Sequence, residues 1–70
     1  MPMLRIPDST GDTRLPFTAE DDIMTLEAVG NVFDQFTLKG YQAFSSGQKL
    51  KAFDPTATED IIMVAPIVGG

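Results

Sequence analysis

The residues with the most chemistry to offer stand at the end of the sequence, where Pro66 is followed by Ile67, Val68, Gly69 and Gly70. The chain contains no Cys and no His. It therefore lacks the usual nucleophile, the usual neutral-pH base and the preferred transition-metal ligands. The carboxyl of Gly70 is the obvious chemical handle that is left. We expect no metal, no bound cofactor and no autonomous catalysis.

The composition of this tail suits insertion into a narrow site on another protein. Gly69 and Gly70 lack a Cβ atom and tolerate backbone angles that other residues avoid. Pro66 stops strand pairing, and Ile67 and Val68 favour an extended backbone whose side chains can dock on a partner. We therefore predict a domain over residues 1-66 and a flexible C-terminal tail over residues 67-70. The alternative is an end without function, since chain termini are commonly disordered.

Length and charge restrict what the rest of the chain can be. Seventy residues with 43% hydrophobic and 21% charged side chains fit one thin globular domain rather than a disordered chain. The net charge of -5 argues against binding nucleic acid or an anionic membrane. No stretch resembles a signal peptide or a membrane span, so a cytoplasmic location is the default expectation.

Two segments of alternating polarity open the chain and predict a β-hairpin. The first covers Met3 to Ile6 and the second Thr13 to Thr18, and residues 7–12 between them are typical of a turn. Pro16 cannot donate a hydrogen bond to a neighbouring strand, so the second strand should lie at an edge of the sheet.

A change to helical spacing predicts a helix after this hairpin. The apolar residues that recur at this spacing are Leu26, Val29, Phe33 and Phe36. Thr25 is the preferred N-cap, with a start at Thr18 as the alternative. Gly30 in the middle costs about 1 kcal/mol relative to Ala, and the helix should end at Leu38 to Gly40.

Three further strands are predicted after the helix. They cover Tyr41 to Ser45, Gln48 to Lys51 and Ile61 to Ala65, with Ser46-Gly47 as the turn between the first two. The last segment is apolar without alternation, as expected for a central strand covered on more than one side. The order β-β-α-β-β-β predicts an α+β fold with a mixed sheet packed on one helix.

Two residues of this last strand have alternative interpretations. Ile61 and Met63 share one face of the strand. They can form an apolar docking surface for a partner, because Met adapts to irregular contacts. They can equally belong to the ordinary core.

Three stretches of the sequence are similar to a known family. Thr25-Leu26-Glu27-Ala28-Val29 resembles its helix start, and Ser46-Gly47-Gln48-Lys49-Leu50 with Phe53-Asp54 resembles its turn between short strands. The end from Glu59 to Gly70, which reads EDIIMVAPIVGG, resembles its closing strand and tail. The family is that of the ubiquitin-like β-grasp proteins. The resemblance is to its sulfur-carrier branch, represented by the molybdopterin synthase small subunit and the thiamine-pathway sulfur carrier.

The resemblance implies a chemistry for Gly70. An ATP-dependent, ubiquitin-activating-like enzyme would adenylate its carboxyl, and a sulfur nucleophile would displace AMP. The resulting thiocarboxylate would pass sulfur to an acceptor or to a synthase subunit. Two alternatives stay open: a protein modifier joined through Gly70 to lysines, and a β-grasp interaction module without tail chemistry.

Overall fold

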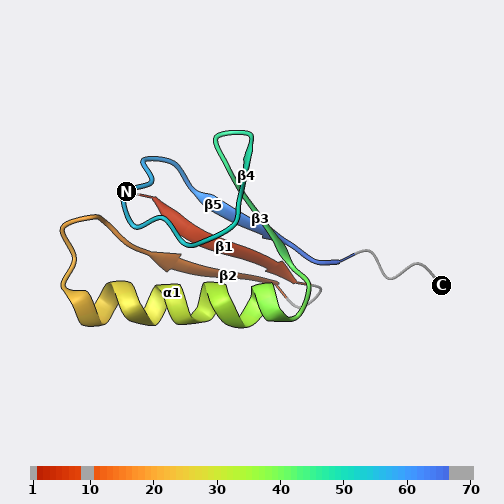
Figure 1. Cartoon of the computed structure of the whole chain (residues 1–70), viewed down its shortest axis with the longest axis horizontal. Helices are drawn as coiled ribbons and strands as arrows, with labels where there is room; N and C mark the ends of the chain where they lie inside the picture. Colours follow the sequence, from red (N-terminus) through yellow and green to blue (C-terminus); the bar gives the residue numbers. More distant parts are fainter. Residues whose placement is uncertain (1, 9–10, 67–70) are drawn as a thin grey trace.

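The structure is a computed structural model, and it describes residues 2–8 and 11–66. These residues form one helix and five strands, and the helix lies along one face of the sheet (Figure 1). In chain order the elements are β1 (Met3–Asp8), β2 (Gly11–Pro16), α1 (Ile23–Leu38), β3 (Gln42–Ser45), β4 (Gln48–Leu50) and β5 (Ile61–Val64). The prediction of an α+β protein with one helix and a mixed sheet is confirmed for this part of the chain.

The sheet places the last strand at its centre. The strand order is β2-β1-β5-β3-β4. β5 runs parallel to β1 and antiparallel to β3, and the connection that parallel neighbours need is supplied by the helix and the β3–β4 hairpin between them. Pro16 lies on β2 at one edge, as predicted.

The first hairpin is longer than its composition indicates. Residues 7–12 were predicted as a turn, but Pro7 pairs with Asp12 and Asp8 with Gly11 in the antiparallel ladder. The carboxylate of Asp12 lies 3.6 Å from a guanidinium nitrogen of Arg14 on its own strand. It also lies 3.6 Å from one of Arg5 across the ladder. These ion pairs favour continued pairing of β1 with β2. The turn-forming residue types alone predict that the first strand ends before residue 7 and that the second begins after residue 12.

The helix starts earlier than predicted. Its N-cap is Asp22, whose carboxylate accepts a hydrogen bond of 2.8 Å from the backbone N–H of Thr25. Both Thr25 and the alternative Thr18 are therefore wrong as caps. The reason is that Ile23 and Met24 in the first turn are 73% and 80% exposed, so the apolar periodicity of the core begins one turn after the helix itself.

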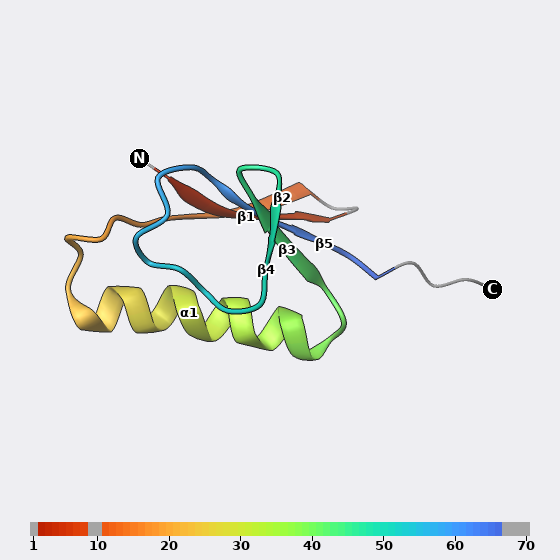
Figure 2. The same cartoon turned by 45° about the horizontal axis from the view of Figure 1, so that its top comes forward.

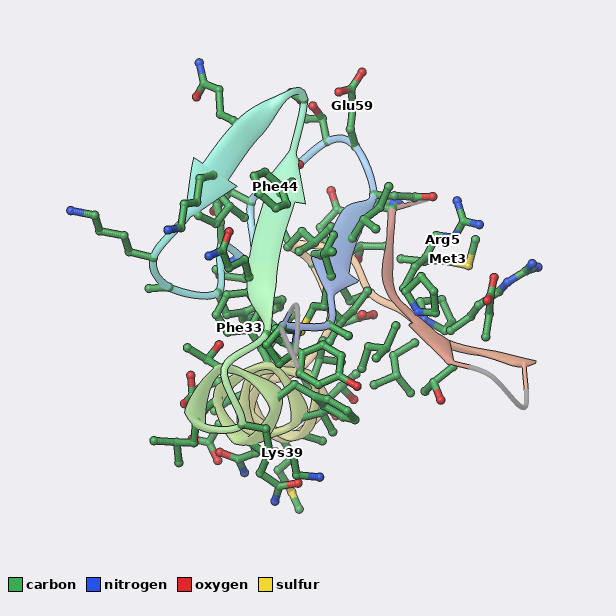
Figure 3. All side chains as sticks on the ribbon, turned by 90° about the vertical axis from the view of Figure 1, so that its right-hand side faces the viewer. Met3, Arg5, Phe33, Lys39, Phe44 and Glu59 are labelled. Carbon is green, nitrogen blue, oxygen red and sulfur yellow. The ribbon has the colours of Figure 1, made fainter. Side chains whose placement is uncertain are left out.

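The core fills the space between α1 and the sheet. Phe33 lies there, pointing from the helix toward the strands (Figure 3). The buried side chains come from both layers and are Leu4, Ile6, Phe17, Val29, Phe33, Ala43, Ile61 and Met63. The predicted helix stripe and the inward face of the hairpin thus meet in one cluster.

The segment after β4 comes down against the helix (Figure 2), and Gly30 makes this approach possible. A Cβ atom added at Gly30 would lie 3.3 Å from Cδ2 of Phe53. The Phe53 ring also packs edge-on against Phe17, at 5.1 Å between centroids, and tilted against Phe33 at 6.0 Å. The cost of a glycine inside the helix is therefore offset by the close packing of the Phe53 ring.

Candidate functional site

The predicted tail residues Ile67, Val68, Gly69 and Gly70 lie outside the described residues. The structure does describe where the tail begins. β5 is hydrogen-bonded to a strand on each side, and after it the chain continues through the exposed residues Ala65 and Pro66. The predicted tail thus follows the central strand of the sheet.

Pro66 also packs against the end of the helix. Gly40 follows the C-cap Lys39 and has φ +95, a conformation that favours glycine. A Cβ atom added there would lie 3.5 Å from two ring carbons of Pro66. The turn after the helix therefore lies against Pro66, the last described residue of the chain.

The predicted binding residues Ile61 and Met63 belong to the core. Both are 0% exposed, so the docking interpretation is wrong for them. Ile61 pairs with Leu4 and Met63 with Ala43, and these partners are also buried. Residues directly opposite each other share a face of the sheet, so this face of β5 is the one that α1 covers.

The exposed side of β5 carries the other two residues of the strand. Ile62 is 38% exposed and Val64 is 48% exposed. The prediction that β5 is covered on more than one side is therefore wrong, because its burial alternates strictly along the strand. The outer face of the sheet, opposite α1, is open in the described part of the protein.

Cross-strand pairing arranges a row of side chains across this outer face. Arg14 is opposite Arg5, Arg5 is next to Ile62, Ile62 is opposite Phe44, and Phe44 is opposite Lys49. The row has an apolar middle with cations on either side. Figure 3 shows two of its members, Arg5 and Phe44, on their separate strands.

Acidic residues form ion pairs with the two arginines at one end of this row. Arg5 lies 3.8 Å from Asp60 and 3.6 Å from Asp12, and Asp12 also contacts Arg14. Asp60 in addition accepts a 3.0 Å hydrogen bond from the backbone N–H of Met3. Because these side chains are partly exposed, each ion pair is worth at most about 1 kcal/mol. Their main effect is to orient two like-charged guanidinium groups beside the apolar middle.

A shallow groove connects the apolar middle to the start of the tail. It has a volume of about 420 Å³ and is lined by Gly40, Gln42, Phe44, Val64, Ala65 and Pro66. Together with Ile62, its apolar members form a surface that we call the tail-root patch, consisting of Phe44, Ile62, Val64 and Pro66. Of these four, the sequence analysis selected Pro66 alone.

Two further carboxylates, those of Asp22 and Asp54, have structural roles. Hydrogen bonds from the side chain and backbone of Thr25 lower the pKa of Asp22, the helix N-cap. Hydrogen bonds from Thr56 lower the pKa of Asp54 in the same way. Within residues 2–8 and 11–66, no three acidic side chains come close enough together to hold a metal ion. No helix in this part is long and apolar enough to cross a membrane.

Comparison of the chain with models of known protein families, with curated proteins and with solved structures finds no match. The function proposed below therefore rests on the sequence resemblance described above and on the geometry of the described residues.

Proposed function

We propose that this protein is a β-grasp carrier whose Gly70 carboxyl is adenylated by an activating enzyme and converted to a thiocarboxylate for sulfur transfer in biosynthesis. One observation carries the proposal. The Gly69-Gly70 pair ends a short segment that follows β5 and begins with Ala65 and Pro66, and β5 is the central strand of the sheet. A reactive end is useful on a firmly held strand, because the body of the protein then delivers it to a partner in a defined direction.

The chemistry needs groups that this chain does not contain. In the first step an oxygen of the Gly70 carboxylate attacks the α-phosphorus of ATP, and pyrophosphate leaves. In the second step a sulfur nucleophile attacks the acyl carbon, and AMP leaves. With hydrosulfide as that nucleophile, the product is a terminal thiocarboxylate. The partner supplies ATP binding and the sulfur source, while this chain supplies the acyl group and its position.

The length of the tail indicates where the partner must dock. Residues 67–70 span at most about 14 Å when fully extended. The active site that receives Gly70 must therefore lie within this distance of Pro66. The tail-root patch is an apolar surface at that point, since Val64 and Pro66 line the same groove. We propose it as the docking surface for the activating enzyme and for the sulfur acceptor.

The first experiment uses the absence of Cys. The sequence contains no cysteine that a thiol-alkylating reagent could modify. The protein is incubated with ATP, sulfide and its activating enzyme, and then with such a reagent. It should gain a label at the C-terminus once the thiocarboxylate has formed. The matched control lacks Gly69 and Gly70 and accounts for reaction at methionine. We expect the control to stay folded and unlabelled. Equal labelling of both proteins contradicts the proposal.

Mass spectrometry of the protein from its host separates the alternatives and also tests whether Gly70 is the mature end. An oxygen-to-sulfur exchange at the terminus supports the carrier. An isopeptide bond between Gly70 and a lysine of another protein identifies a modifier instead. If Gly70 keeps an unmodified carboxylate although its activating enzyme is present and active, the protein is instead an interaction module without tail chemistry.

The docking role of the tail-root patch has its own test. Val64→Asp places a charge on the exposed side of β5, and Thr37→Asp places the same charge on the exposed surface of α1. We expect adenylation of Val64→Asp to need a much higher protein concentration, while Thr37→Asp behaves like the unaltered protein. Equal rates for both variants contradict the assignment of this patch.

A further inference from the structure

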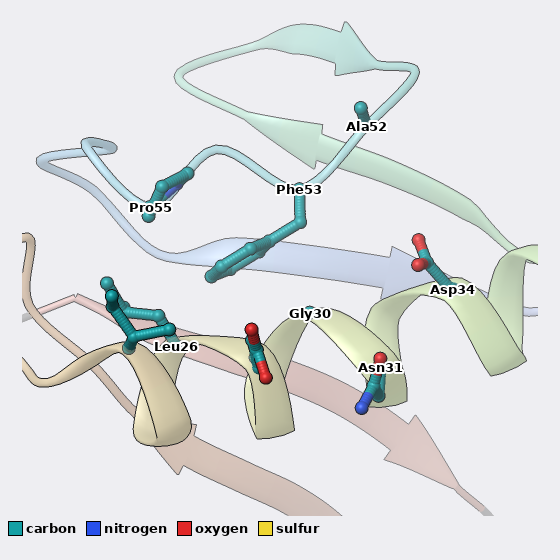
Figure 4. A pocket seen from close by; sticks show the side chains of 9 residues that line it. Leu26, Gly30, Asn31, Asp34, Ala52, Phe53 and Pro55 are labelled. Atoms are coloured by element: carbon teal, nitrogen blue, oxygen red, sulfur yellow. The ribbon is translucent and has the colours of Figure 1, made fainter.

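A second groove lies between α1 and the segment that follows β4 (Figure 4). It is separate from the outer face of the sheet, which carries the tail-root patch. It has a volume of about 460 Å³. Its apolar lining, from both elements, consists of Ile23, Leu26, Gly30, Ala52, Phe53 and Pro55. We call it the helix–loop groove. It shares no lining residue with the tail-root patch, so it is a separate surface.

Acidic and amide groups form the helical side of this groove. They are Glu27, Asn31 and Asp34, which lie four and three residues apart and so share one face of the helix. Figure 4 shows Asp34 and Asn31 along the helix below the loop that carries Ala52 and Phe53. Within residues 2–8 and 11–66, neither Glu27 nor Asp34 takes part in an ion pair.

Three of the five basic residues have partners in the described part of the chain, while Lys51 directly precedes the groove-lining residue Ala52. Arg5 and Arg14 are paired with acids on the sheet, and the ammonium group of Lys39 lies 4.8 Å from the centre of the Phe36 ring. None of the groove-lining residues is basic. The two free carboxylates therefore complement a positively charged ligand.

The open shape of the groove favours a protein segment over a small molecule as its ligand. A small-molecule site usually encloses most of its ligand, whereas several lining residues here, including Ile23, Glu27 and Asp34, are exposed. Glu27 and Asp34 are seven residues apart, which is about 10 Å along a helix axis. Basic residues seven positions apart on a second helix have the same separation.

We propose that the helix–loop groove binds a cationic amphipathic helical segment of a partner protein. The apolar stripe of that segment covers Ile23, Leu26 and Phe53. Its Lys or Arg residues, one every two turns, face Glu27 and Asp34. This surface is independent of the tail chemistry, so the proposal stands or fails separately from the sulfur-carrier function.

The probe for this groove is a fluorescein-labelled helical peptide of about 18 residues, which gives five turns. It has Leu at helical spacing, Lys on the flanks and Ala elsewhere. The matched control peptide has Glu in place of each Lys. We expect saturable binding of the Lys peptide in fluorescence anisotropy and shifts of the backbone resonances of Gly30, Asn31 and Phe53 in NMR spectra. The Glu peptide should not bind.

Variants of exposed residues locate the binding on the groove. Ile23→Ser removes an apolar lining residue, and Met24→Ser is its control, because Met24 is equally exposed but does not line the groove. Glu27→Gln combined with Asp34→Asn should weaken binding between about 2-fold and 30-fold at low ionic strength, which corresponds to two exposed ion pairs. Glu20→Gln is the charge control and should change little.

Four results would overturn the proposal. The first is the absence of saturable binding of the Lys peptide, and the second is equal affinity for the Lys and Glu peptides. The third is equal weakening of binding by Ile23→Ser and Met24→Ser. The fourth is self-association of the protein that Ile23→Ser abolishes, which would assign the groove to a second copy of this chain.

Discussion

Neighbouring isoleucines on β5 offer a direct test of which face of the strand is buried. Ile61 is 0% exposed and Ile62 is 38% exposed. The same substitution at both positions, Ile61→Thr and Ile62→Thr, keeps the β-branched shape and therefore the preference for a strand. The two variants differ in the environment of the new hydroxyl group and in the apolar area that is lost.

The structure gives the expected magnitudes. At Ile61 the change removes about two buried carbon groups, worth about 1.6 kcal/mol, and buries a hydroxyl group at a cost of about 1 to 3 kcal/mol. The expected loss is therefore about 2.6 to 4.6 kcal/mol. At Ile62 the hydroxyl reaches water and the apolar area is already partly exposed, so the expected loss is about 1 kcal/mol. A chain of this length has a total stability of only about 3.5 to 10 kcal/mol.

Urea unfolding followed by circular dichroism measures the difference. With a slope near 1 kcal/mol per molar urea, the midpoint of Ile61→Thr should fall about 2 to 4 M further than that of Ile62→Thr. If Ile61→Thr does not fold, the milder pair Ile61→Val and Ile62→Val keeps the same order, with about 1 kcal/mol lost at Ile61 and less at Ile62. Equal losses, or a larger loss at Ile62, would refute the assignment of the buried face.

Three further predictions concern the turns, the helix and pH. Gly40→Ala should lower the free energy of unfolding by about 1 kcal/mol or more in urea unfolding, because Gly40 has φ +95. Gly30→Ala should change it by less than about 0.5 kcal/mol, because the gain in helix propensity is offset by the 3.3 Å approach to Phe53. The lowered pKa values of Asp22 and Asp54 mean that their ionised forms stabilise the fold above about pH 4, and that this contribution is lost as the pH falls through the lowered pKa. Replacing both by Asn should make acid unfolding less steep; an unchanged pH profile would contradict their role.

The sequence predicts the elements well where polar and apolar residues alternate or follow helical spacing. Leu4 and Ile6 stand at alternating positions on either side of Arg5, and the structure buries both. Phe33 recurs at helical spacing and is also buried. Pro16 indicates an edge strand because it lacks an N–H, and β2 is at the edge. In each case a local chemical property of the residue determines its place.

The outer face of β5 could not be read in the same way. Residues 61–64 are all apolar, so the pattern does not show which two of them point inward. That choice is made by the register with β1 and β3, which pairs Ile61 with Leu4 and Met63 with Ala43. A shift of one residue would exchange the two faces. The register depends on contacts between distant parts of the chain, so Ile62 and Val64 were missed as surface residues.

The two grooves also depend on long-range contacts. Phe53 lies more than twenty residues from Gly30 in the sequence and packs on it in the fold. The sequence alone shows a glycine that weakens a helix, and the contact that compensates for it becomes visible in three dimensions. Similarly, Phe44 joins the tail-root patch because its strand is paired beside β5.

The sulfur-carrier function is tested by the mass of the C-terminal peptide of the protein purified rapidly from its host. A fraction of Gly70 should have one carboxyl oxygen replaced by sulfur. That fraction should react with a thiol-alkylating reagent at mildly acidic pH, where amines are protonated, and it should disappear when the activating enzyme is removed. A Gly70 carboxylate that is never exchanged while the activating enzyme is present and active would contradict the account.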